Sequence, residues 1–242
     1  GGMGGAQPLA GRMAGAAILC VDIDPERAAK RKAVGYLEHV APDLDTNMGT
    51  YHCGWATVAG KKTFLSRTGY TGEDGFEIYA APGLIVKYWD AFLKAGVVPC
   101  GLGCRDTLRF EVGLPLYGDE LSSEISPVMA GLSMFCKLDK PEFIGKEALA
   151  AQKAEGVKQK VVGIELNDRA IPRHGYKVLH EGEVIGEVTT GYHTISSDKS
   201  VCMALIDAKY AKLGTELEIQ IRKKTYPGVV VKKRFYDKHY KK

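Results

Sequence analysis

Long hydrophobic runs are absent from this sequence of 242 residues, in which the best apolar stretch is the short one from Ala14 to Val21. A membrane-spanning helix needs about 18 apolar residues, so we expect no membrane span and no membrane partner. Cysteine is also sparse, with 6 residues scattered along the chain. That number and spacing exclude a disulfide framework and predict free thiols in a reducing compartment.

The composition is that of a globular protein, with 45% hydrophobic and 26% charged residues. The length suits one large domain or two small ones. The net charge of +4 is unevenly distributed, because residues 222–242 carry nine Lys or Arg against one Asp, a local +8 that leaves −4 for the rest. Such a basic segment can hold nucleic acid, an acidic protein or an anionic small molecule, or it can simply be the solvated end of a strand. We expect no nucleic-acid partner.

The first residues contain a glycine cluster, GGMGG, of the kind that lets backbone N–H groups approach a pyrophosphate. A small-residue helix over 10–17, a strand over 18–24 and a helix over 26–35 are predicted to follow. An acid about 20 residues after the glycines fits ribose recognition, and the alternative is a flexible terminus. The strand that should precede the glycines is not in the sequence, so we expect no NAD binding. The words GGMGGAQPLA and VDIDPERAAKR resemble the glycine-rich segment of urocanate hydratase, over about residues 1–45.

From Gly49 the pattern changes to two short strands, 55–58 and 63–66, and then to the glycine-rich loop and strand RTGYTGEDGFEIY. Alternation along that strand places Glu77 and Tyr79 on one face if Phe76 and Ile78 face the core. A carboxylate so placed can accept two N–H bonds from a guanidine-like edge, such as that of a pterin. The alternative is a solvent-facing Glu on a strand.

Two helices are predicted next. Apolar residues at helical spacing predict the first over 84–94, with Trp89 in the core. Arg105 stands at the start of the second, where it can lie alongside a carboxylate ligand or pair with a neighbouring acid. Cys100 and Cys104 lack the spacing and the second pair of a zinc site, so we expect no metal.

The last ninety residues contain six short alternating runs separated by glycine turns, which predict a small antiparallel barrel. The runs are Val161–Leu166, Tyr176–Leu179, Val184–Thr190, Val201–Ile206, Leu217–Ile221 and Val229–Val231.

Several of these segments together resemble the T-protein of the glycine cleavage system, an aminomethyltransferase, over about residues 49–242. They are SRTGYTGEDGFEIY, GLGCRDTLRFEVGLPLYGDEL, PVMAGL, FIGKEAL and PGVVVKKRFY. The resemblance implies an α+β fold, with a ferredoxin-like central folate-binding domain over 49–150 and a C-terminal antiparallel β-barrel over 157–242. Residues 1–45 would be an N-terminal α/β fragment of a dinucleotide-binding type.

The resemblance also implies an activity. The family transfers the methylene of an aminomethyl group, carried on the lipoyl arm of H-protein, to tetrahydrofolate, and releases ammonia. Lipoylated H-protein and tetrahydrofolate are therefore the expected partner and co-substrate, in the cytoplasm or, in a eukaryote, the mitochondrial matrix. Residue by residue, Tyr70 and Arg105 match folate-contacting residues, and Glu77 matches the carboxylate that binds the pterin edge.

The sequence departs from the family in three ways. Met134 stands where the family usually has Trp, and Met129 where it often has Glu. The acidic pair that carries the family's catalytic Asp is not found, and we assign no catalytic residue. Two hypotheses follow: an aminomethyltransferase impaired by truncation, or a folate-binding or protein-interaction module without turnover.

Overall fold

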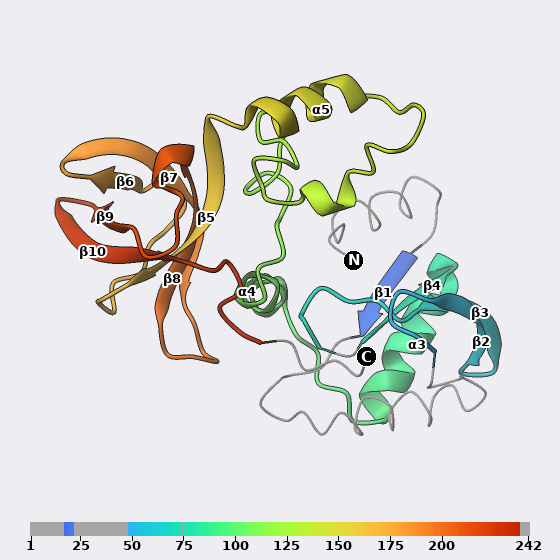
Figure 1. Cartoon of the computed structure of the whole chain (residues 1–242). Helices are drawn as coiled ribbons and strands as arrows, with labels where there is room; N and C mark the ends of the chain where they lie inside the picture. The colour runs from blue at the N-terminus through green and yellow to red at the C-terminus, as the bar shows by residue number, and fades with distance from the viewer. Residues whose placement is uncertain (1–16, 22–47, 74, 238–242) are drawn as a thin grey trace. The chain divides into compact units, whose positions relative to one another are not determined.

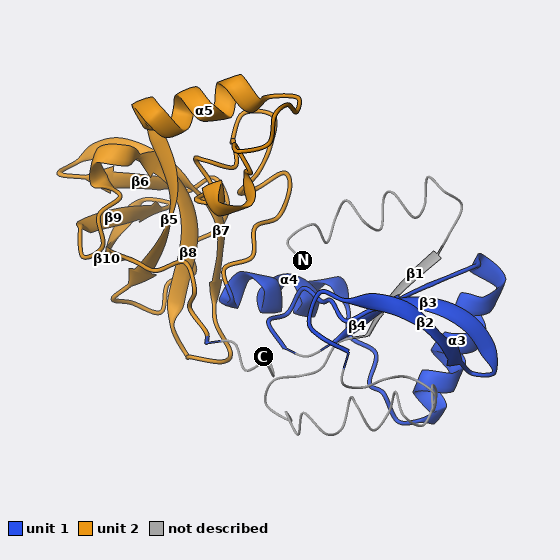
Figure 2. Cartoon of the chain, turned by 45° about the vertical axis from the view of Figure 1, so that its right-hand side comes forward, with its two compact units in different colours: residues 1–112, 237–242 blue, residues 113–236 orange. Residues whose placement is uncertain are grey.

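A computed structural model describes residues 17–21, 48–73 and 75–237 of the chain. These residues form two compact units, one reaching up to Val112 and including Asp237, and one from Gly113 to Tyr236 (Figure 2). The predicted glycine cluster and the helix over 26–35 lie outside the described residues. The domain boundaries expected from the sequence, at 45–49 and 150–157, stay predictions.

The first unit contains a four-stranded antiparallel sheet in the order β1-β4-β3-β2 (Figure 1). Its strands are β1 (Ala17–Val21), β2 (Cys53–Val58), β3 (Lys61–Ser66) and β4 (Phe76–Ala80). The tight turn between β2 and β3 uses Ala59 and Gly60, both with positive φ, as a two-residue hairpin of matching twist requires. The two strands predicted around this turn are confirmed.

Helix α3 (Pro82–Lys94) packs on one face of this sheet, and Pro82 pre-sets the backbone of its first turn. Tyr88 and Phe92, one helical turn apart, are buried on the sheet, and the Tyr88 hydroxyl lies 2.5 Å from Oγ1 of Thr63. The helix predicted here is confirmed, but the prediction that Trp89 belongs to the core is wrong, because 42% of it is exposed. The buried stripe follows the Tyr88–Phe92 pair, and the adjacent position turns toward solvent. The unit continues into α4 (Leu102–Glu111).

The second unit is a closed six-stranded barrel preceded by a long irregular segment. That segment contains the short helix η2 (Ser133–Phe135) and α5 (Lys146–Glu155). The barrel strands are β5 (Gln159–Leu166), β6 (Lys177–His180), β7 (Glu183–His193), β8 (Ser200–Asp207), β9 (Glu216–Ile221) and β10 (Lys224–Val231), with the short helix η3 (Ala208–Tyr210) before β9. They pair antiparallel in the cyclic order β10-β5-β8-β7-β6-β9, which confirms the barrel predicted from the alternating runs.

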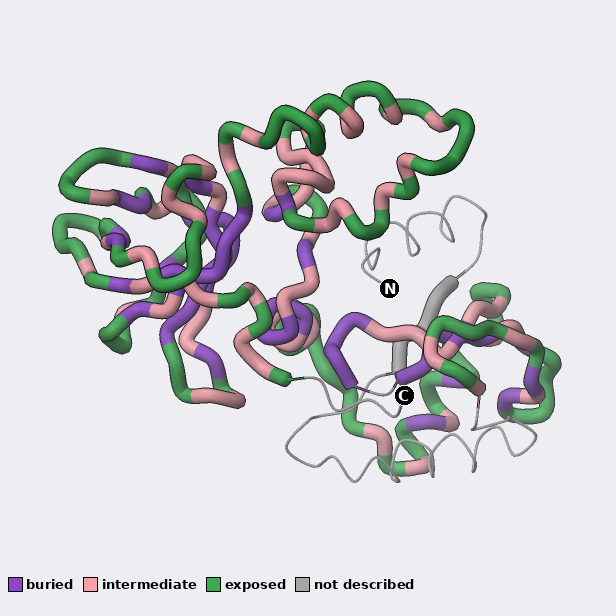
Figure 3. The backbone as a smooth tube through the Cα atoms, in the orientation of Figure 1, coloured by how far each residue is buried: buried purple, intermediate pink, exposed green. Residues whose placement is uncertain are grey.

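The barrel has an apolar interior, seen as the buried segments of its strands in Figure 3. Ile164, Val188 and Ile206 are fully buried there. Two glycines of β7 allow close backbone approach. A Cβ at Gly186 would lie 2.1 Å from the Leu205 carbonyl oxygen, and a Cβ at Gly191 would lie 2.0 Å from the Pro172 carbonyl oxygen. No larger residue fits these positions without moving the backbone.

Candidate functional site

The candidate site begins on β4, where alternate side chains face opposite sides of the sheet. Phe76 and Ile78 are buried in the cluster that packs against α3, as predicted. Glu77 and Tyr79 therefore lie on the other face, opposite Ser66 and Phe64 of β3 in the strand register. Glu77 is nevertheless only 5% exposed, so this carboxylate is held inside the unit rather than in bulk water.

Hydroxyl groups surround the Glu77 carboxylate. Thr68 Oγ1 donates a hydrogen bond to Oε2 of Glu77, and the Tyr79 hydroxyl donates to the same oxygen at 3.3 Å. Ser66 Oγ lies 2.7 Å from Thr68 Oγ1 and extends the network by one member. Hydrogen bonds to a carboxylate oxygen are charge-assisted and fix the orientation of the group. Ser66 and Thr68, on the β3 side of the connecting loop, thus help to hold Glu77 on β4 in place.

The glycine-rich loop that connects β3 to β4 packs against the end of α4. Gly72 has a φ of +86°, and a Cβ there would lie 2.3 Å from Cγ1 of Val112. Only glycine combines this backbone conformation with such close contact. The same loop carries Tyr70, which is buried, and the Arg105 guanidinium of α4 lies 4.5 Å from the centre of its ring. This cation–π contact joins loop and helix.

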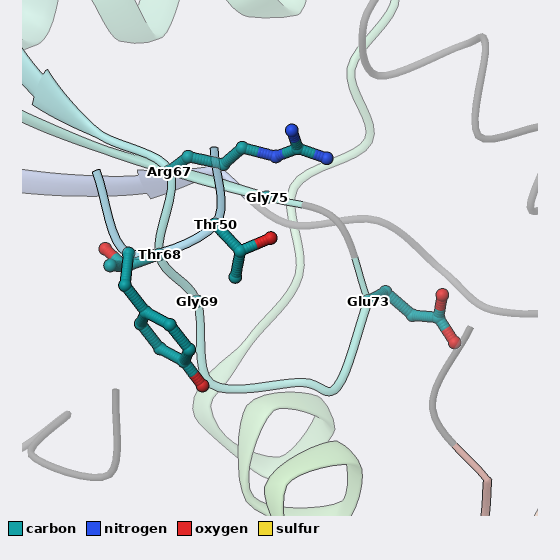
Figure 4. A pocket seen from close by; sticks show the side chains of 7 residues that line it. Thr50, Arg67, Thr68, Gly69, Glu73 and Gly75 are labelled. Carbon is teal, nitrogen blue, oxygen red and sulfur yellow. The ribbon is translucent and has the colours of Figure 1, made fainter. Parts of the chain in front are cut away.

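A small, open hollow lies beside this loop (Figure 4). It is lined by residues that precede β2 and by residues of the β3–β4 loop: Thr50, Tyr51, Arg67, Thr68, Gly69, Glu73 and Gly75. Thr68 borders the hollow and also donates to Glu77, so the hollow adjoins the carboxylate. Arg67 Nη1 donates to the Met48 carbonyl at 2.5 Å. The hollow has room for about one water molecule, far less than a pocket that encloses a whole ligand.

The three residues singled out from the sequence all lie in the first unit. Tyr70 and Arg105 touch each other, whereas Glu77 is held by Thr68 and Tyr79. Sequence reasoning missed Thr68. The only signal in the sequence was a hydroxyl nine positions before Glu77, the second residue of β4, with a glycine-rich loop between them. Asp74 of the same loop lies outside the described residues.

A second polar cluster lies at the end of β7 and its connection to β8. His193 Nδ1 lies 3.0 Å from Ser200 Oγ, and its Nε2 lies 2.9 Å from Oδ1 of Asp198. Arg169 Nη2 reaches both oxygens of Asp198, at 2.7 and 2.8 Å. Hydrogen bonds from His193 and then Arg169 hold the pKa of Asp198 below its ordinary value of 3.8. The order of contacts resembles a nucleophile triad, but Ser200 Oγ lies against Nδ1 of His193, whereas a triad serine lies against Nε2. We interpret these contacts as structural, because they hold the connection between β7 and β8 in place.

Among residues 17–21, 48–73 and 75–237, no group of three or more metal-ligating side chains comes together. No helix within these ranges has the length and apolar character to span a bilayer. His174 lies in the loop before β6, with its Nδ1 2.7 Å from the Thr189 carbonyl oxygen. Two methionines stand where the sequence departs from the family pattern. Met134 is 74% exposed, and the carbonyl of Met129 accepts a hydrogen bond from the Val161 N–H at 2.9 Å.

Comparison with known families decides the relationship. Residues 32–140 match the GCVT N-terminal domain, and residues 159–237 match the glycine cleavage T-protein C-terminal barrel domain. The chain belongs to the glycine cleavage T-protein family. Residues 1–62 also match the Urocanase Rossmann-like domain, which overlaps the first T-protein match over 32–62. Both resemblances expected from the sequence are therefore found, and the T-protein match begins 17 residues before the expected Gly49.

Curated T-protein relatives share more than half of their aligned residues with this chain. The aminomethyltransferase of Thermoanaerobacter pseudethanolicus is 53% identical over 189 residues, which is 76% of this chain and 51% of the relative. That of Lysinibacillus sphaericus is 56% identical over 183 residues, or 74% of this chain and 50% of the relative. The chain thus spans about half the length of the curated T-proteins it matches.

A solved T-protein has the same fold. The glycine cleavage system aminomethyltransferase T from Bartonella henselae superposes with a TM-score of 0.72 and 21% sequence identity, over 94% of this chain and 86% of that one. At this identity the likeness concerns the fold alone. It agrees with the α+β fold and terminal barrel expected from the sequence.

Proposed function

We propose that the Glu77 site binds the pterin edge of tetrahydrofolate, and that this T-protein segment takes part in aminomethyl transfer. In that reaction the methylene of an aminomethyl group on the lipoyl arm of H-protein passes to tetrahydrofolate. Ammonia and the dihydrolipoyl arm are released. Lipoylated H-protein and tetrahydrofolate are the partner and co-substrate of this proposal.

The observation that carries the proposal is the buried Glu77 carboxylate, held in a fixed orientation by Thr68 and Tyr79. The pterin edge presents adjacent N–H donors, which a carboxylate accepts as a pair of charge-assisted bonds. Burial strengthens these bonds, because water does not compete for the same oxygens. Tyr70 and Arg105, stacked on each other at the loop, are the proposed further contacts to the folate.

The test is a calorimetric titration of tetrahydrofolate into the parent, Glu77→Gln and Glu73→Gln, after each has been checked for folding by circular dichroism. Gln has the size of Glu but replaces one acceptor oxygen with a donor, so a ligand N–H would face another N–H. We expect Glu77→Gln to weaken binding by about 2–4 kcal/mol. Glu73→Gln, in the adjoining loop, should change it much less. Equal affinities of the parent and Glu77→Gln would remove Glu77 from the site.

A second experiment separates the enzyme from the binding module. The sequence leads us to expect little turnover by this chain, because no catalytic acid of the family pattern was found in it. The measurement is the glycine-synthesis assay with H-protein and tetrahydrofolate, run on protein that binds folate by calorimetry. Folate binding without turnover supports the binding module, whereas turnover at the rate of a full-length T-protein contradicts our expectation.

A further inference from the structure

Strand β2 forms one edge of the four-stranded sheet, at the opposite end from β1 (Figure 1). The barrel of the second unit is closed, so its ladder of paired strands has no such edge. Within the described ranges, β3 is the one strand that pairs with β2. The outer side of β2 is therefore a place where a strand of another molecule can add to the sheet.

The usual protection of an edge strand is missing from β2. Soluble proteins block such an edge with a charge, a proline or a bulge on the outer strand. The sequence of β2, CGWATV, contains neither a charged residue nor a proline. Its register with β3 runs without a shift from Cys53 to Val58, so β2 contains no bulge. The Nζ of Lys62, on the neighbouring strand, lies 5.3 Å from the centre of the Trp55 ring of the same chain.

The hairpin determines which backbone groups of β2 point outward. Its turn has two residues, so the pair Val58–Lys61 that closes it is hydrogen-bonded, and hydrogen-bonded and non-hydrogen-bonded pairs alternate from there. Trp55 and Phe64 therefore form a non-hydrogen-bonded pair, and the N–H and C=O of Trp55 point away from β3. The same holds for Cys53, two residues earlier.

The side chain of Trp55 adds an apolar surface at the same place. One side of its ring packs edge-on against Phe64, with ring centres 5.3 Å apart, yet the residue remains 66% exposed. When a strand is added to an edge, main-chain hydrogen bonds give affinity and side chains give specificity. Trp55 supplies both, because its backbone points outward and its indole is accessible.

A second copy of β2 fits this edge because the strand is complementary to itself. In an antiparallel pair about a two-fold axis at Trp55, outward-pointing residues lie opposite each other, Trp55 with Trp55 and Cys53 with position 57. Gly54 and Ala56, which lie opposite each other on the α3 face, are small. No like charges meet along the strand, and the two indoles form a cross-strand aromatic pair.

We propose that the chain forms a symmetric dimer through antiparallel pairing of its β2 strands about Trp55. The two four-stranded sheets then form one continuous sheet. Five inter-strand steps of about 4.8 Å separate the two β4 strands, so the two Glu77 carboxylates lie on one face, about 24 Å apart across the sheet. One pair of short strands is a small interface, below the roughly 1,200 Å² of a standard one, so the dimer is weak and dissociates on dilution. This inference does not depend on folate binding.

The first test is sedimentation velocity of the full chain under reducing conditions, from about 1 μM to about 300 μM, which brackets a weak association. We expect a monomer at the low end and a dimer at the high end. Trp55→Lys places two positive charges opposite each other at the axis and should raise the dissociation constant at least about tenfold. The matched control is Trp89→Lys, the same change at the other tryptophan of the chain, exposed on α3, and it should stay within about twofold of the parent.

The second test uses the native Cys53 to check the register covalently. Thr57→Cys places a thiol opposite Cys53 of the second copy, at the Cα separation of about 5.5 Å that a hydrogen-bonded pair has and a disulfide can span. Within one chain the two positions are about 13 Å apart along the strand, too far for a disulfide. Oxidised glutathione should therefore convert Thr57→Cys into a covalent dimer on a non-reducing gel. The parent, which keeps its other exposed cysteines, and the double variant Thr57→Cys/Cys53→Ser should remain monomers on that gel.

The outcomes that overturn the dimer are as definite. A parent that sediments as a monomer at the highest concentration overturns it, and so does a dimer that Trp55→Lys leaves intact. A Thr57→Cys protein that does not cross-link, or that still does so without Cys53, has a different register and also overturns it. If circular dichroism shows that Trp55→Lys does not fold, the cross-linking result decides alone. Cross-linking of Thr57→Cys to a different protein instead of to itself would assign the edge to that partner and overturn the dimer.

Discussion

Thr68 shows how a single hydroxyl fixes the orientation of a buried carboxylate. Its Oγ1 hydrogen-bonds both Glu77 and Ser66, so it links β3, the loop and β4 in one contact chain. Alternation along the strand predicted correctly that Glu77 and Tyr79 share a face. It could not reveal that Thr68 reaches the same carboxylate, because that contact depends on how the glycine loop folds back.

We predict that Thr68→Val weakens tetrahydrofolate binding about tenfold, because the carboxylate loses one fixed donor and gains rotational freedom. Valine keeps the branched shape, so the fold should persist. Thr68→Ser, which retains the hydroxyl, should bind within a factor of about two of the parent. Calorimetry on the three proteins measures the effect. A Thr68→Val protein with the parent's affinity would show that the hydroxyl does not position Glu77.

The contacts of Asp198 with His193 and Arg169 lead to a prediction about how stability depends on pH. The pKa of Asp198 is lowered below 3.8 in the folded protein by His193 and then Arg169, so the unfolded chain binds its proton first as the pH falls. This contribution to stability is present above pH 3.8 and is lost as the pH falls through the lower, folded pKa. Thermal unfolding of the parent and Asp198→Asn between pH 3 and pH 7 should therefore show a small difference at neutral pH that shrinks in the acid range. A difference that stays constant down to the lowest pH would contradict the assignment.

At the scale of the element, the barrel strands were the most predictable part of the chain. Period-two alternation with glycine at the turns located all six, because each strand faces the interior with one side only. The main errors were in β10, expected over 229–231 and observed as Lys224–Val231, and in β7, expected over 184–190 and observed as Glu183–His193. Strand β7 is paired on both sides, by β6 and β8, and backbone pairing extends it through residues whose side chains do not alternate.

A register shift in β7 lets two consecutive threonines hydrogen-bond the same carboxylate. Thr189 and Thr190 are consecutive, and on a regular strand they would face opposite sides. The shift between Val188 and Thr190 lets both hydroxyls donate to Oε1 of buried Glu120, at 2.7 and 2.6 Å. Oε2 of the same carboxylate accepts the Leu116 N–H at 3.0 Å. The bulge thus attaches the segment before the barrel to the barrel wall.

We predict that Glu120→Ala lowers the free energy of unfolding by about 2–4 kcal/mol, because it leaves buried donors without their acceptor. Glu120→Gln keeps one acceptor oxygen and should cost less. Glu124→Ala, an exposed acid in the same segment, is the matched control and should have almost no effect. Urea unfolding of the three variants measures these changes. Equal midpoints for Glu120→Ala and Glu124→Ala would show that the attachment does not contribute.

At the scale of the whole molecule, two family resemblances meet in one sheet. β1 lies within the segment that matches the Urocanase Rossmann-like domain, yet it pairs antiparallel with β4 of the T-protein sheet. The sequence predicted a short strand here and could not predict its partner, because a five-residue apolar run fits any open sheet edge. The helices predicted around it lie outside the described residues.

This pairing bears on nucleotide binding. Dinucleotides bind where neighbouring parallel strands diverge, at the carboxyl ends of a doubly wound sheet. Every pair in the described four-stranded sheet is antiparallel, so β1 does not lie in such a crevice. We predict no NAD binding above background in calorimetry. Micromolar affinity for NAD would show that residues 1–45 form a site of their own.

The closed barrel also determines when the second unit can finish folding. Strand β10 pairs with β9 beside it in sequence and with β5 about sixty residues earlier, and no other strand closes the ring. During synthesis, β5 to β9 can only form an open sheet with two unpaired edges until Val231 has left the ribosome. The ring then closes in one late, long-range step, which is slow compared with local hairpin formation. A chain that lacked β10 would hold this unit as an open sheet with two unpaired edges, its most aggregation-prone form.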